Sequence, residues 1–186
     1  LTILTFGETI VGISSYMTKT ASLVFPLFVF ALVVGLFLIY IYEHDNMIDH
    51  HSRSDGITYM TITAWFIVIL GNLTVALEYM PMEEVDFVPK SIYLVTCLVL
   101  YLLSSFLLGR FNKREFHYSL RFVAGRVGVC AFIVAIALAT GFDPLVNIIA
   151  DTVAVYVALW HEWLLYRRRT GILAFGHSLG ISHDDM

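Results

Sequence analysis

The chain has 186 residues, of which 59% are hydrophobic and only 14% are charged, and its formal net charge is −4. Soluble domains carry about 25% charged residues, so this composition excludes an ordinary soluble globule and a disordered chain. A net negative charge provides no positive field for phosphate backbones, and we expect no nucleic-acid partner. The sequence predicts an all-α protein, a polytopic bundle of transmembrane helices whose partner is the lipid bilayer.

The apolar segments predict six membrane-spanning helices. Each segment is continuous, lacks the alternation of barrel strands, and is close to the roughly 20 residues that cross about 30 Å of hydrocarbon. In chain order the segments cover residues 1–17, 21–42, 57–80, 91–109, 122–141 and 144–166. We therefore predict one helical bundle over residues 1–169 and a cytoplasmic tail over residues 170–186.

The distribution of lysine and arginine predicts the orientation. If the helices alternate in direction, Lys19 and Lys90 fall on one side of the membrane and eight basic residues fall on the other. Loops rich in Lys and Arg stay on the cytoplasmic side, so we expect a plasma-membrane protein with a cytoplasmic C-terminus. The eight residues are Arg53, Arg110, Lys113, Arg114, Arg121, Arg167, Arg168 and Arg169.

Three polar residues are predicted at one depth near the middle of the membrane. Glu8, Asn72 and Asp151 lie about 10–14 Å from the non-cytoplasmic boundary when counted along their helices. Asn147 precedes Asp151 by one turn and shares its face. An ionisable group in hydrocarbon costs at least about 2.5–3.5 kcal/mol, so each needs a partner or a function. The sequence allows two readings, a proton or cation site and a set of interhelical hydrogen bonds that hold the helices together.

Arg126 and Glu162 are predicted to form an ion pair. Each lies about 6 Å inside the cytoplasmic end of its helix, on consecutive antiparallel helices. Equal depth favours contact between them. The alternative is that Arg126 extends its guanidinium to water at the boundary by itself.

The stretch from residue 43 to residue 55 is rich in side chains that bind metals. Imidazole and carboxylate groups suit Zn²⁺, Mn²⁺ or Fe²⁺. Their spacing matches none of the sharp metal motifs, so a solvated loop is the alternative reading. The sequence identifies no cofactor. The candidate metal ligands are His44, Asp45, Asp49, His50 and His51.

Three segments resemble a known family. They are residues 4–12 (LTFGETIVG), residues 40–43 (YIYE), and Gly71 followed by residues 75–78 (VALE). Over roughly residues 1–80 the chain resembles the bacterial low temperature requirement protein A family. Members are longer multispanning proteins, so the resemblance implies that this chain is a C-terminal portion preceded by further helices of the same protein. The biochemical activity of that family is undefined, so the resemblance supplies no mechanism.

Three functions remain open from the sequence. The first is a transporter that moves a proton, a cation or a small solute through the midplane polar residues. The second is a membrane-embedded metal enzyme that uses the loop at residues 43–55, and the third is a structural or accessory protein linked to growth in the cold. An enzyme is less favoured, because no Gly-rich phosphate loop and no Gly-x-Ser-x-Gly motif is present. Whether the bundle forms a homo-oligomer also stays open.

Overall fold

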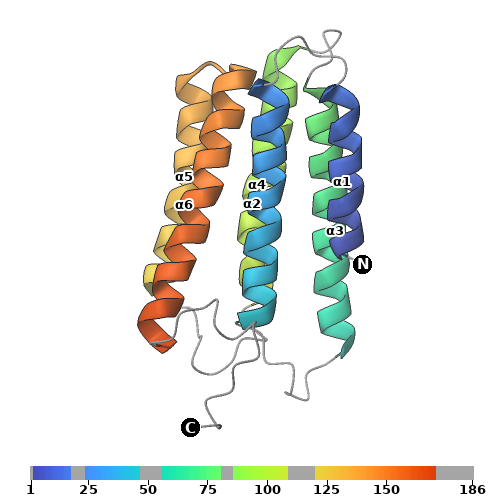
Figure 1. Ribbon diagram of the computed structural model, residues 1–186. Helices are drawn as coiled ribbons and strands as arrows, with labels where there is room; N and C mark the ends of the chain where they lie inside the picture. Colours follow the sequence, from blue (N-terminus) through green and yellow to red (C-terminus); the bar gives the residue numbers. More distant parts are fainter. Residues whose placement is uncertain (1, 18–23, 47–55, 81–85, 109–119, 171–186) are drawn as a thin grey trace, which may run out of the picture.

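The computed structural model describes residues 2–17, 24–46, 56–80, 86–108 and 120–170 (Figure 1). These ranges contain six helices and no strand, which confirms the predicted all-α bundle. The helices are α1 (Thr2–Met17), α2 (Val24–Asn46), α3 (Gly56–Tyr79), α4 (Phe87–Leu108), α5 (Leu120–Ala139) and α6 (Pro144–Thr170).

Five of the helices, α2 to α6, are long and apolar enough to cross a membrane, which fits an integral membrane protein. α1 lies where the first helix is predicted, and it is shorter, with 16 residues. Of the six predicted spans, the described residues contain five as long apolar helices and one as a shorter helix. Residues 171–186 of the predicted tail lie outside the described residues.

The helices stand side by side in two layers, with α6, α2 and α1 in front of α5, α4 and α3 (Figure 1). The main contacts follow the order α1–α3–α4–α5–α6–α2 and back to α1, and α4 also touches α6. α2 and α6 finish at the end of the bundle where α3 and α5 begin, which we name the lower end after its place in Figure 1. The apolar faces of these helices meet inside the bundle and form its core.

An aromatic cluster joins four helices at the core. Tyr101 on α4 is 2% exposed, and its ring meets Phe66 on α3 and Phe6 on α1 edge to face, with centroid distances of 5.6 and 6.5 Å. Its hydroxyl donates a hydrogen bond of 3.0 Å to the carbonyl oxygen of Leu36 on α2. A buried tyrosine hydroxyl needs such an acceptor, so this bond both satisfies Tyr101 and fixes α4 against α2.

The turn between α5 and α6 follows from four consecutive residues. Gly141 and Phe142 both have positive φ (60° and 65°), and the Phe142 N–H donates to the Ala137 carbonyl oxygen at 3.0 Å, which ends α5 in a Schellman-type turn. Asp143 then caps α6, because its Oδ1 accepts the backbone N–H groups two and three residues ahead, each at 3.0 Å. Pro144 occupies the first helical position, where no N–H is needed. This short turn fixes the register in which α5 and α6 pack.

The α1–α3 contact is built from small and polar residues. Thr9 and Thr74 share a hydrogen bond of 2.7 Å between their hydroxyls. Gly12 lies against α3 so closely that a Cβ there would be 3.0 Å from Oε1 of Glu78. Two segments that carry the family resemblance, residues 4–12 and 75–78, therefore pack against each other.

Candidate functional site: a buried charge cluster

Three charged side chains from three helices meet inside the lower half of the bundle. Arg126 on α5 donates from a single nitrogen, Nη2, to Oε1 of Glu43 on α2 at 2.5 Å and to Oε1 of Glu162 on α6. The three side chains are 2%, 4% and 1% exposed, respectively. We name Glu43, Arg126 and Glu162 the charge cluster.

The contact between Arg126 and Glu162 is the one that their equal depth predicts. The alternative, in which Arg126 reaches water at the boundary, is wrong, because the guanidinium is buried and paired. The place of Glu43 was missed. The sequence predicts a second helix that ends at residue 42, with Glu43 in the loop that follows, whereas α2 continues to Asn46. If Glu43 is counted as helical, it becomes a third charged residue at the same end of the bundle as Arg126 and Glu162. This is the sequence signal by which its place can be found.

The charge cluster holds more acid than base. With both carboxylates ionised its formal charge is −1, and a buried net charge is costly, whereas one added proton makes the cluster neutral. Ser105 on α4 gives Glu43 a side-chain hydrogen bond. Among the described residues, Nη1 of Arg126 and Oε2 of Glu162 have no hydrogen-bond partner. Glu162 therefore offers a buried oxygen on which a proton can be placed.

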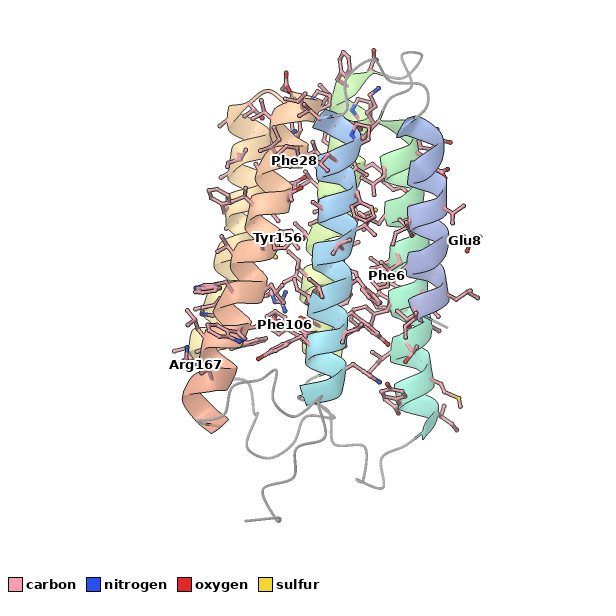
Figure 2. All side chains as sticks on the ribbon, in the orientation of Figure 1. Phe6, Glu8, Phe28, Phe106, Tyr156 and Arg167 are labelled. Carbon is pink, nitrogen blue, oxygen red and sulfur yellow. The ribbon has the colours of Figure 1, made fainter. Side chains whose placement is uncertain are left out.

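Apolar side chains close the cluster on one side. The guanidinium carbon of Arg126 lies 5.7 Å from the ring centre of Phe122. The ring of Phe106 meets Phe122 edge to face at 6.2 Å, and Tyr42 and Leu165 also pack on Phe122. Phe106 is labelled in Figure 2 in the lower part of the bundle. This apolar packing strengthens the electrostatic interactions of the cluster by excluding water.

A second polar group lies higher on the same face of α6. Asn147 and Asp151 are one turn apart and are 1% and 2% exposed. The Thr140 hydroxyl donates to Oδ1 of Asn147 at 2.9 Å, and Thr152 donates to the Phe28 carbonyl oxygen of α2 at 3.1 Å. Within the part of the chain that the structure describes, Oδ2 of Asp151 and Nδ2 of Asn147 have no hydrogen-bond partner. The Asp151 oxygen therefore remains available to a proton, a water molecule or a small cation, and the Asn147 nitrogen can donate a hydrogen bond to a water molecule.

The single midplane site predicted from Glu8, Asn72 and Asp151 is not formed. Glu8 is exposed and points away from the bundle (Figure 2). Asn72 is also exposed and accepts a hydrogen bond of 2.8 Å from Tyr93 on α4. α6, which carries Asp151, has its main contacts with α2 and α5, whereas α1 has its main contacts with α2 and α3. Counting residues along a helix predicts the depth of each residue but not the direction in which its side chain points.

The structure describes only part of the predicted metal-binding stretch. Asp49, His50 and His51 lie outside the described residues, and only the backbone of Asp45 is described. The His44 ring stacks on Tyr40 with centroids 5.7 Å apart, and its Nδ1 lies 3.2 Å from the hydroxyl of Tyr59. Within the described ranges, no group of three or more His, Cys, Asp or Glu side chains is arranged to hold a metal ion.

Comparison of the chain with protein-family models, with curated proteins and with solved structures finds no match.

Proposed function

We propose that this protein moves protons across a membrane along the buried face of α6, between Asp151 and the charge cluster. One observation carries the proposal. Asp151 and Glu162 lie on the same buried face of α6, are at most 2% exposed, and each have an oxygen without a hydrogen-bond partner among the described residues. Acidic side chains buried within membrane helices are typical of proton relays.

In the proposed path, the observed packing of α2 on α6 is a closed state. Asp151 and Glu162 are 11 residues apart, which is about 17 Å along the helix. The buried Ala154, Val155 and Ala158 occupy the face between them. On α2, a Cβ at Gly35 would lie only 2.8 Å from Cγ1 of Val155. A proton therefore crosses this apolar stretch only when the α2–α6 contact opens and admits water.

The direction of the path is part of the proposal. The bias of eight basic residues against Lys19 and Lys90 supports a cytoplasmic lower end. The charge cluster is then the cytoplasmic proton site, and Asp151 is the site nearer the opposite side. The three small or β-branched residues between them separate the two aqueous sides.

We also propose that this chain is a protein of the low temperature requirement A type. The support is the packing of residues 4–12 on residues 75–78 and the place of Glu43, the last residue of the YIYE segment, in the charge cluster. Growth at low temperature of a strain lacking the host gene, with and without this chain, tests the link to the cold. No recovery of growth would remove that link.

Proton flux into vesicles tests the transport proposal. Purified protein is reconstituted in liposomes that contain a pH-sensitive dye, and a potassium diffusion potential drives the protons. We expect Asp151→Asn and Glu162→Gln each to abolish flux. Glu8→Gln is the matched control, because it also removes a carboxylate within an apolar helix but lies on the exposed face of α1. It should leave flux unchanged.

Two results contradict the proposal. One is wild-type flux no larger than that of protein-free liposomes. The other is full flux in both Asp151→Asn and Glu162→Gln. If the carboxyl groups only hold helices together, these variants lower the unfolding temperature without any flux being present to lose. Size-exclusion chromatography and circular dichroism of each variant separate loss of fold from loss of flux.

A further inference from the structure

His161 stands beside the charge cluster. It precedes Glu162 on α6, and its side chain is half-buried, whereas the three charged side chains of the cluster are at most 4% exposed. Together with Phe122, Gly125, Arg126, Ala158 and Glu162 it lines a pocket between α5 and α6. The pocket connects the buried cluster with a ring that reaches the surface of the bundle.

The facing helix is shaped to receive the His161 ring. Gly125 lies opposite it on α5, and a Cβ at that position would overlap three atoms of the imidazole. The ring therefore rests directly on the α5 backbone at the residue before Arg126. The pairs Gly125–Arg126 and His161–Glu162 meet across the two helices, so the glycine sets how closely the imidazole approaches the cluster.

The pocket is small. It is about 170 Å³ in total, including the space that is open to the surroundings. His161 lines it beside Arg126 and Glu162, so a titratable imidazole lies between the cluster and the surface of the bundle. Histidine is the side chain whose ordinary titration range spans pH 5 to 8, and its two nitrogens allow it to receive a proton on one side and release it on the other.

We propose that His161 carries the proton between the lower aqueous side and Glu162 of the charge cluster. This inference rests on the proposed function, since it assigns the residue by which protons enter or leave the same path. In the inward step the N–H bond of the imidazolium breaks and an O–H bond forms on the Glu162 carboxylate. The products are a neutral imidazole and a charge cluster whose formal charge has changed from −1 to 0, so one proton moves and no electron is transferred.

The charges around His161 come from three helices. Arg126 on α5 opposes a positive imidazolium, and Glu162 on α6 and Glu43 on α2 favour it. Arg167, one to two turns further along α6, lies over the ring of Trp163 at 5.3 Å. α4 contributes the uncharged Ser105, which bonds to Glu43. A proton on the cluster removes part of the attraction for the imidazolium, which couples the two protonation steps.

The test measures proton flux in liposomes at equal pH on both sides, driven by a potassium diffusion potential. We expect His161→Ala to lower flux by about a hundredfold, as is usual for loss of a proton-transfer group. Added imidazole should restore flux in His161→Ala but not in the double variant His161→Ala/Glu162→Gln. Gly125→Ala should also lower flux, because its Cβ displaces the ring. Gly128→Ala is the matched control on α5, where a Cβ meets nothing within 4 Å, and should leave flux unchanged.

The outcomes separate this inference from the proposed function. Both the path along α6 and the role of His161 are supported by three results together. The wild type shows flux, Asp151→Asn abolishes it, and imidazole restores the flux that His161→Ala lowers. Flux that persists in His161→Ala, or that falls without recovery by imidazole, overturns the role of His161 and leaves the path along α6 intact. Absence of flux in the wild type overturns both. A purely structural role for His161 predicts loss of stability with no response to imidazole.

Discussion

Glu43 and Glu162, from helices α2 and α6, reach the same nitrogen of Arg126 on α5. The two carboxylates are therefore close to each other and are kept together by one guanidinium. This arrangement ties three helices at one level, and it also places an excess acid where water is excluded. The stability of the lower half of the bundle and the proposed proton chemistry depend on the same three side chains.

Replacing Arg126 should be far more harmful than replacing either acid. Arg126→Met leaves two buried carboxyl groups without a cation, and breaking a buried ion pair in this way costs about 3–5 kcal/mol. Glu43→Gln leaves a balanced pair between Arg126 and Glu162, so its loss should be smaller. Unfolding of the detergent-solubilised protein by heat or denaturant measures both.

A triple variant that removes all three charges checks that the residues interact. The triple variant Arg126→Met/Glu43→Gln/Glu162→Gln has no uncompensated charge, so it should be more stable than Arg126→Met alone. Equal or lower stability of the triple variant would show that the guanidinium does not hold the two acids together.

Any side chain at position 35 should destabilise the bundle, because α6 packs directly against Gly35. A Cβ at Gly35 would lie 2.8 Å from Val155 and 3.2 Å from the ring of Tyr156. We expect Gly35→Ala to destabilise the bundle by about 1–3 kcal/mol, as overpacking usually does. Adding Val155→Ala should recover part of this loss, because it removes the atom in closest approach. Gly71→Ala is the matched control on α3, where a Cβ meets nothing within 4 Å, and should be neutral or slightly stabilising.

Thr9 and Thr74 should couple weakly. Their hydroxyls are 2.7 Å apart, and interhelical hydrogen bonds in membranes average about 0.6 kcal/mol. We expect Thr9→Val and Thr74→Val each to lower the free energy of unfolding by a similar small amount, with the double variant no worse than either. Fully additive losses would mean that the hydroxyls do not bond to each other.

The topology is testable by labelling in intact cells. The distribution of basic residues predicts that position 113 is cytoplasmic and that position 84 is on the other side. A single cysteine introduced as Glu84→Cys should react with an impermeant maleimide. A single cysteine introduced as Lys113→Cys should be protected from it. The native Cys97 and Cys130 are buried and are changed to alanine in this background. The reverse pattern of labelling would invert the orientation of the proposed proton path.

The helix content of this protein follows from its sequence alone. Long apolar segments must satisfy their own backbone hydrogen bonds in lipid, so continuous hydrophobic runs can only become helices or barrel strands, and length decides between them. The same reasoning predicts the ends of helices within a few residues. It fails at Glu43, because a charged residue after an apolar run reads as a boundary, whereas pairing with Arg126 allows α2 to continue for another turn.

Depth along a helix is also contained in the sequence, because each residue advances the chain by about 1.5 Å. Depth predicts the Arg126–Glu162 contact, since a four-residue turn joins α5 to α6 and makes them neighbours. It does not predict which way a side chain points on helices that are distant in the chain. Glu8 and Asp151 are predicted at the same depth, yet Glu8 faces outward on α1 and Asp151 is buried on α6. Only the tertiary packing, set by close contacts such as Gly35 on Val155 and Gly125 on His161, decides which polar residues meet.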